Sequence, residues 1–250
     1  MKLMVCGKGG CGKSTLSSLL AFSFARAGKK VLVVDMDESN FGLHRQLGVE
    51  LPTDFTMYFG AKKGIYKILD GEGSDGNPFG RRWTLHDIPA DFSSGDENLK
   101  LVAVGKIHHA GEGCACAMGT VAKCFAQYVD LSDDEVMICD TEAGVEHFGR
   151  GVDNAADMIL MVIDPSFESV KLSEKISEMA DSLGKPVFFV LNKADEKQLE
   201  MMKKVIKRPE RIAGCVTASD DVLMKGLMGE SLKDVTIDAV EHLREVLCRG

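Results

Sequence analysis

The chain has 250 residues, of which 45% are hydrophobic and 27% charged, enough apolar material for one large domain spanning 1–250. Its 30 basic and 38 acidic side chains give a net charge of −8, which argues against binding to nucleic acid, because that depends on Lys and Arg neutralising phosphates. No apolar run approaches the ~20 residues of a membrane-spanning helix, and the opening MKLMVC lacks the features of a signal peptide. We therefore expect a cytoplasmic protein that binds no membrane.

Short, nearly continuous apolar runs predict buried parallel strands. In chain order these are Leu3–Cys6, Val31–Asp35, Leu99–Val104, Val136–Asp140, Met158–Asp164, Val187–Asn192 and Ile212–Val216. Helical spacing and stop signals predict helices over Lys13–Ala27, Met118–Val129, Ser166–Leu183, Glu196–Ile206 and Ile237–Leu247. The alternation predicts a doubly wound α/β fold, with a mainly parallel sheet of about seven to eight strands flanked by helices.

The stretch 49–98 interrupts this alternation. It is rich in Gly, Asp and Pro, as in GEGSDGNPFG (71–80), and only Ile65–Leu69 reads as a short helix. A long irregular insertion is more often a functional or partner-binding loop than a packing element. We expect it to be such a loop within the single domain.

A glycine-rich motif follows the first strand and opens the first helix. Its residues are Gly7-Lys8-Gly9-Gly10-Cys11-Gly12-Lys13-Ser14, which fit the P-loop pattern G-x-x-x-x-G-K-[ST]. We expect the backbone from Gly9 to Thr15 to cradle phosphates, with Lys13 reaching the β- and γ-phosphates and the Ser14 hydroxyl binding Mg²⁺. The chain is therefore predicted to be a P-loop nucleoside triphosphatase.

Carboxylates end two of the predicted strands, in VLVVDMD (31–37) and EVMICD (135–140). Ligands bind at the carboxyl ends of such strands. We expect Asp140 to support Mg²⁺ through water, and Asp35 or Asp37 to bind the same ion or to orient the attacking water. A strand-end cap is the alternative role for each.

The sixth predicted strand ends in Asn192-Lys193-Ala194-Asp195. The N-K-x-D pattern is typical of guanine recognition, whereas Asn192 can equally pair with an adenine edge. These residues predict a base-binding site and leave the base open.

KGGCGKS (8–14) resembles the deviant Walker A loop, which carries a second lysine near its start. The families that share it include septum-site and partitioning ATPases, the nitrogenase iron protein and the arsenite ATPase. The resemblance implies that Lys8 reaches a partner's nucleotide in an ATP-dependent homodimer, that Asp37 is a catalytic switch residue and Asp140 the Walker B residue. It also implies ATP, read by Asn192 and Lys193.

A closer resemblance is to CooC-type ATPases, which mature carbon monoxide dehydrogenase. It rests on the Cys114-x-Cys116 pair within 113–117, on AGVEH (143–147) and on Arg150-Gly151. The resemblance implies Ni²⁺ delivery to the catalytic subunit of carbon monoxide dehydrogenase or of its acetyl-CoA synthase complex. Many of these ATPases carry Pro or Gly at the variable position of a DT-x-AG switch segment, and this chain departs from that pattern with Glu142.

The Cys-x-Cys pair supplies half of a metal site. In extended backbone both side chains point the same way, and thiolates suit Ni²⁺, Zn²⁺ or Cu⁺ in four-coordinate sites. A homodimer formed on ATP or metal binding supplies the other two thiolates across its two-fold axis. The alternatives are plain loop thiols, a redox disulfide or a bridging iron–sulfur cluster, with His108 and His109 as auxiliary ligands or merely solvated.

Two other functions compete with nickel delivery. A MinD- or ParA-like spatial-organisation ATPase requires a basic surface or a membrane-binding tail, whereas TIDAVEHLREVLCRG (236–250) has an apolar face with mixed charge and is expected to dock on the body. A reductase requires a subunit-bridging cluster.

Overall fold

The computed structural model describes residues 1–60, 64–65, 67, 77–107, 115–145, 151 and 153–249, with the backbone alone at 115–117 and 153. Strands form one eight-stranded sheet of order β3-β4-β2-β5-β1-β6-β7-β8. They are β1 (Lys2–Gly7), β2 (Lys30–Asp35), β3 (Ser94–Gly95), β4 (Leu99–Ala103), β5 (Glu135–Asp140), β6 (Met158–Ile163), β7 (Val187–Asn192) and β8 (Ile212–Val216). All neighbours pair in parallel except β3 with β4, which confirms the predicted fold class.

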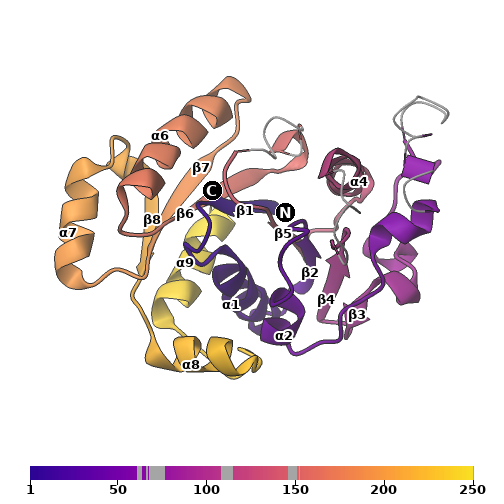
Figure 1. Cartoon of the computed structure of the whole chain (residues 1–250), viewed down its shortest axis with the longest axis horizontal. Coiled ribbons are helices and arrows are strands. Elements are labelled where there is room, and N and C mark those ends of the chain that lie inside the picture. Colours follow the sequence, from indigo (N-terminus) through magenta and orange to yellow (C-terminus); the bar gives the residue numbers. More distant parts are fainter. Residues whose placement is uncertain are drawn as a thin grey trace.

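Helices cover both faces of the sheet (Figure 1). They are α1 (Lys13–Arg26), α2 (Leu43–Leu47), α4 (Ala115–Tyr128), α6 (Phe167–Ser182), α7 (Glu196–Val205), α8 (Asp220–Met228) and α9 (Asp238–Arg249). The five long predicted helices are present. The predicted short helix Ile65–Leu69 lies partly outside the described residues, which lack 66, 68 and 69. The structure adds α2 and α8, which the sequence analysis missed, and the short edge strand β3.

The alternation of side chains along the strands divides the core in two. On β1, Leu3 and Val5 pack with α1 and α9, whereas Met4 and Cys6 pack with α4 and α6 on the other face. Because both faces are covered, the strands are apolar throughout, as is typical of parallel sheets.

Much of the insertion 49–98 packs into the core. Phe55, in the 3₁₀ turn Phe55–Phe59, is fully buried, and Trp83 is 5% exposed. The Phe55 ring lies against the rings of Tyr58, Phe59, Phe79, Trp83, Phe92 and Phe125. Offset and edge-on aromatic pairs add stability beyond their buried area. The aromatic cluster therefore fixes this part of the insertion on α4, and a partner-binding role for the rest stays a prediction.

We expect Phe55→Ala to lower the free energy of unfolding by about 3–5 kcal/mol, because it removes the centre of this cluster and leaves a cavity. Urea unfolding followed by tryptophan fluorescence measures the loss at Trp83. Met57→Ala, on the same turn but 55% exposed, is the matched control. Equal losses in the two variants would contradict a packing role for the cluster.

Candidate nucleotide-binding site

The P-loop joins β1 to α1 at the carboxyl edge of the sheet. Gly12 has φ 101° at the start of α1, and a Cβ there would lie 2.4 Å from Asn192 Nδ2. The Cys11 N–H donates to the Lys8 carbonyl at 3.3 Å, and the Cys11 side chain is buried. No side chain caps α1, so its first N–H groups face the loop. This is the arrangement that binds phosphate at a helix N-terminus.

The two P-loop lysines have different environments. Lys13 is 7% exposed, and its ammonium donates to the Lys8 carbonyl at 3.4 Å. The Lys8 ammonium instead lies 3.5 Å from Asp164 Oδ2, just past β6. Partial burial works against ionisation of Asp164, but the hydroxyls of Ser166 and Ser169 and the Lys8 charge together hold its pKa below the ordinary value. Lys13 therefore lies within the loop, and Lys8 lies at its rim.

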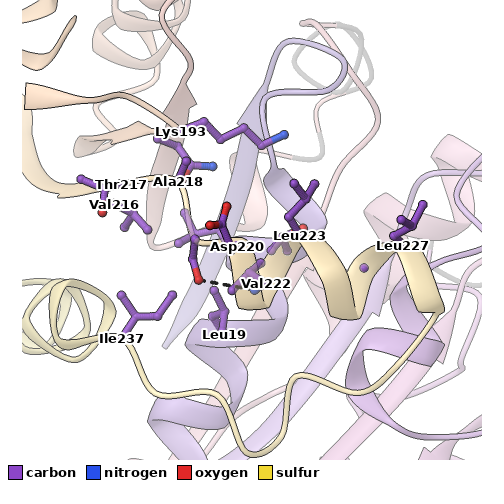
Figure 2. Close-up of a pocket in the computed structure, with 15 residues that line it drawn as sticks. Leu19, Lys193, Val216, Thr217, Ala218, Asp220, Val222, Leu223, Leu227 and Ile237 are labelled. Carbon is purple, nitrogen blue, oxygen red and sulfur yellow. Dashed lines mark hydrogen bonds between the residues drawn. The ribbon is translucent and has the colours of Figure 1, made fainter. Parts of the chain in front are cut away.

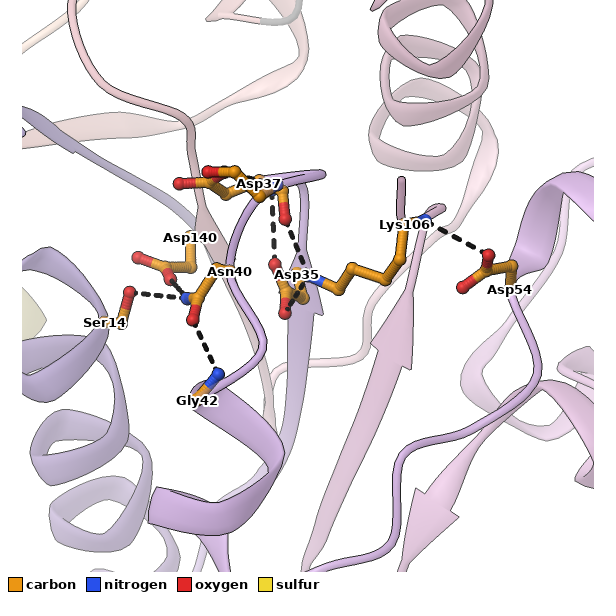
Figure 3. A network of polar contacts seen from close by, with 9 residues as sticks. Ser14, Asp35, Asp37, Asn40, Gly42, Asp54, Lys106 and Asp140 are labelled. Atoms are coloured by element: carbon orange, nitrogen blue, oxygen red, sulfur yellow. Dashed lines mark hydrogen bonds and ion pairs between the residues drawn. The ribbon is translucent and has the colours of Figure 1, made fainter. Parts of the chain in front are cut away.

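Asp140 lies beside the P-loop, at the end of β5 (Figure 3). Its Oδ1 accepts from the Ser17 hydroxyl at 3.1 Å, and its Oδ2 accepts from Asn40 Nδ2 at 3.4 Å. The same amide donates to Ser14 Oγ at 2.8 Å. Asp140 is fully buried, and that burial raises its pKa to about 6. The oxygens of Ser14 and Asp140 therefore converge on one point.

Asp35 ends β2 next to Asp140 but has other partners. Its Oδ2 lies 2.6 Å from the Lys106 ammonium, and its Oδ1 accepts from the Asp37 N–H at 3.2 Å. Burial raises the pKa of Asp35 to about 7, against the opposing pull of Lys106. The sequence analysis missed Lys106, which lies just beyond β4 in a stretch without a motif.

Asp37 lies on the loop after β2. Its Oδ1 accepts from the backbone N–H of Ser39 at 2.9 Å and from the hydroxyl of Ser39 at 2.6 Å. The structure thus places Asp37 near the site, with its carboxylate oriented by its own loop.

The residues after β7 contact the P-loop directly. Asn192 Nδ2 donates to the Cys11 carbonyl at 2.8 Å, and Lys193 Nζ donates to the Gly10 carbonyl at 2.9 Å. Asp195 instead caps α7, where its carboxylate accepts from the Gln198 N–H at 2.8 Å. Of the N-K-x-D pattern, the structure brings the Asn and the Lys to the P-loop and uses the Asp as a helix cap.

A pocket of about 370 Å³ lies beside this contact (Figure 2). Its polar lining includes Thr15, Asn192 and Lys193 together with Thr217, Ser219 and Asp220, and the remaining walls are mostly apolar. Those walls include Leu19, Val216, Leu223, Leu227 and Ile237. Apolar walls with a few polar groups suit a flat aromatic base. Helix α8, absent from the sequence prediction, supplies Leu223 and Leu227.

The segment that follows β5 contacts the backbone of β1 and of the P-loop. The Gly144 N–H donates to the Gly7 carbonyl at 3.1 Å, and the Thr141 hydroxyl donates to the Val5 carbonyl at 2.8 Å. Glu142 lies between these contacts. His147 and Arg150 lie outside the described residues.

The Cys-x-Cys segment is described only in part. Cys114, His108 and His109 lie outside the described residues. Helix α4 begins at Ala115, three residues before the predicted Met118, so Cys116 has helical backbone. The expectation of extended backbone is therefore wrong at Cys116. Within the described ranges, no group of three or more His, Cys, Asp or Glu residues is placed to hold a metal ion.

The sheet, the P-loop between β1 and α1, and the acidic strand ends define a P-loop nucleotide-binding protein. Residues 3–231 match the family model "CobQ/CobB/MinD/ParA nucleotide binding domain". The chain belongs to this family and is a P-loop ATPase of the MinD/ParA class.

Two relatives indicate where the chain lies within the family. It is 41% identical to an uncharacterized ATP-binding protein of Methanocaldococcus jannaschii, covering 100% of both chains. It is 31% identical to the carbon monoxide dehydrogenase accessory protein CooC of Rhodospirillum rubrum, over 77% of this chain and 74% of that protein.

Solved structures share the fold. The septum site-determining protein MinD of Pyrococcus horikoshii, complexed with Mg-ADP, has a TM-score of 0.68 at 17% identity and covers 98% of this chain and 95% of that one. A ParA family ATPase of Chlorobium tepidum has a TM-score of 0.65 at 20% identity, with 98% and 97% coverage. Among the described residues, no helix is both long and apolar enough to cross a membrane.

We expect burial of Asp140 to make stability depend on pH. Its folded pKa of about 6 lies above the ordinary value of 3.8, so the folded state keeps a proton that the unfolded state releases between these values. Stability is therefore fully present below the unfolded pKa and declines as pH rises toward the folded pKa, by at most about 1.4 kcal/mol for each pH unit. Asp140→Asn does not titrate, so its unfolding free energy relative to the wild type should increase from pH 4 to pH 6. Urea unfolding over that range measures it, and a pH-independent difference would contradict the assignment.

We expect Asp195→Ala to lower the free energy of unfolding by about 1 kcal/mol, because α7 loses its N-cap. The ratio of the ATP and GTP dissociation constants should stay unchanged, since the Asp195 carboxylate is held by the helix end. Thermal unfolding and fluorescent-nucleotide titration measure the two effects. Asp195→Asn, which preserves a capping oxygen, is the control, and a changed ATP/GTP ratio would restore a base-reading role.

Proposed function

We propose that this protein is a Mg-ATP-dependent dimeric ATPase that delivers nickel to carbon monoxide dehydrogenase, or to its acetyl-CoA synthase complex, during maturation. The observation that carries the proposal is the 31% identity to CooC over 77% of the chain, in a sequence that also holds Cys114 and Cys116. Family membership alone supports an ATPase. The accessory function rests on this relative and on the paired thiols.

The described residues supply the parts of an ATP site. Lys13 and the P-loop backbone from Gly9 to Thr15 bind the phosphates, and the pocket beside Asn192 and Lys193 takes the base. Asp195 is occupied as the cap of α7, which favours adenine over guanine. Asp37 is the residue that orients water for hydrolysis, with Lys8 and Lys13 stabilising charge on the transferred phosphoryl group.

The donor set fits magnesium at Ser14 and Asp140. Their oxygens lie 2.8 and 3.4 Å from the same Asn40 nitrogen, so they converge as hard oxygen ligands must. When bound, the ion neutralises charge on the phosphates. Asp35 fits less well as a ligand, because Lys106 and the Asp37 N–H engage its two oxygens. We therefore assign magnesium to Ser14 and Asp140, and to Asp35 a supporting role.

Dimer formation requires Lys8 to exchange partners. In the single chain its side chain is 34% exposed and pairs with Asp164 at 3.5 Å. A partly exposed ion pair of this kind contributes little stability, about 0–1 kcal/mol. The cost of moving Lys8 to a nucleotide on the partner subunit is therefore small.

The nickel cargo is held by Cys114 and Cys116 of both subunits. Four soft thiolates match the coordination preferences of Ni²⁺, and of Zn²⁺ as a substitute. Because a two-fold dimer brings together two copies of one segment, ATP and metal both stabilise the same assembly. By linkage, each then increases the affinity for the other.

The C-terminal helix weighs against a spatial-organisation role. Val240, Leu243 and Leu247 of α9 are buried, and Glu241 pairs with Arg26 of α1 at 2.5 Å. The apolar face of α9 is therefore packed on the body of the protein and is not available to a membrane surface.

We expect the wild type with Mg-ATP and Ni²⁺ to elute as a dimer holding about one nickel ion per two chains. Cys114→Ala/Cys116→Ala should lose the metal and keep ATP binding. Size-exclusion chromatography followed by metal analysis of the dimer fraction measures both. Cys248→Ala removes an exposed thiol from α9 and is the matched control. Wild-type nickel content in the double variant would rule out the proposed metal site.

A further inference from the structure

Lys106 is a buried cation that the ATPase chemistry described above does not use. Its side chain is 0% exposed, and its ammonium lies 2.6 Å from both Asp35 Oδ2 and the Asp37 carbonyl oxygen (Figure 3). A buried ammonium is costly unless it is paired and hydrogen-bonded. The buried ammonium therefore needs both acceptors, the Asp35 carboxylate and the Asp37 carbonyl. It fixes the Asp37 carbonyl relative to the end of β2.

Backbone hydrogen bonds also join the chain beyond β4 to the loop beyond β2. The Val104 N–H donates to the Asp35 carbonyl at 2.9 Å, and the Ile107 N–H donates to the Glu38 carbonyl at 3.2 Å. The chain beyond β4 thus runs alongside the loop beyond β2. Main-chain bonds hold the two segments together at both ends, and the Lys106 ammonium holds them in the middle.

The Asp37 loop leads to Asn40, whose amide donates to Ser14 and Asp140 in the nucleotide site. One cation therefore stands between the loop of the proposed switch aspartate and the chain beyond β4.

We propose that Lys106 is a positioning residue: it ties the chain beyond β4 to the loop beyond β2 and holds the Asp37 backbone in place for hydrolysis. The role of Asp37 in hydrolysis rests on the proposed function. Lys106 itself touches neither the phosphates nor the cargo.

The first test separates kcat from KM. Lys106→Met should lower kcat for ATP hydrolysis by about tenfold or more, because small displacements of a catalytic group are costly, and should leave the ATP dissociation constant within about twofold, because the P-loop is untouched. Lys100→Met, on β4 with a partly exposed side chain, is the matched control. Wild-type kcat in Lys106→Met would overturn the proposal.

Removal of Lys106 leaves Asp35 buried without its cation, which can prevent folding. In that case Asp35→Asn/Lys106→Met is compared with Asp35→Asn/Lys106→Gln, because neither variant leaves an unpaired buried charge and the Gln amide keeps a neutral donor. The proposal expects the Met variant to have the lower kcat, since only it lacks a donor to the Asp37 carbonyl. Equal kcat values would show that Lys106 merely neutralises Asp35, and would overturn the proposal.

The second test checks the role of Asp37 itself. Asp37→Asn should lower kcat at least as far as Lys106→Met does. Wild-type kcat in Asp37→Asn would contradict the proposed role of Asp37, whereas a loss of kcat in Asp37→Asn with wild-type kcat in Lys106→Met would overturn the positioning role alone.

Discussion

Two carboxylates placed side by side in an apolar sheet are the constraint on which the site depends. Asp35 and Asp140 are register partners on β2 and β5, and they are 1% and 0% exposed. Burial raises the pKa of both carboxyls, and the Asp140 charge raises that of Asp35 further, so the pair requires compensation. The compensation is asymmetric: Asp35 receives the Lys106 ammonium, whereas Asp140 receives neutral donors, the Ser17 hydroxyl and the Asn40 amide. Within the part of the chain that the structure describes, Asp140 therefore makes no salt bridge, although the charge of nearby Lys13 acts against the effect of burial on its pKa. The P-loop hydroxyl of Ser14 converges on the same position.

Strand order explains why this pair lies beside the P-loop. β5 lies between β1 and β2 in the sheet. The P-loop, Asp140 and Asp35, which follow or end β1, β5 and β2, therefore lie side by side in that order at the carboxyl edge of the sheet. On the other side of β1, β6 brings Asp164 to Lys8, and β7 brings Asn192 to the Cys11 carbonyl. Ligands bind at this edge of open α/β sheets because the loops there diverge to opposite faces.

Sequence patterns predicted the buried framework well and the long-range contacts poorly. The seven apolar strands and the P-loop were readable because burial on both faces and the glycine motif leave local signatures. Helix α8 was missed because none of its residues is buried, although Ser219 at its start and Gly229 at its end are good capping signals. Lys106 was missed for another reason: its partner Asp35 is 71 residues away, and no local pattern marks a lysine for burial. The Asp195 assignment shows the same limit, because a motif cannot tell a base-reading carboxylate from a helix cap.

The described parts of the chain that flank the Cys-x-Cys segment are held in place by different kinds of contact. Before it, the chain is fixed by polar contacts at Lys106 and Ile107 to the loop that carries Asp37. After it, α4 is fixed by apolar packing, with Phe125 buried against Phe55 of the aromatic cluster. Polar contacts with a loop beside the phosphate site can rearrange when charge is introduced there, whereas a packed aromatic contact resists displacement. Nucleotide binding is therefore expected to act on the contacts of Lys106 and Ile107, whereas the aromatic contact holds α4 in place.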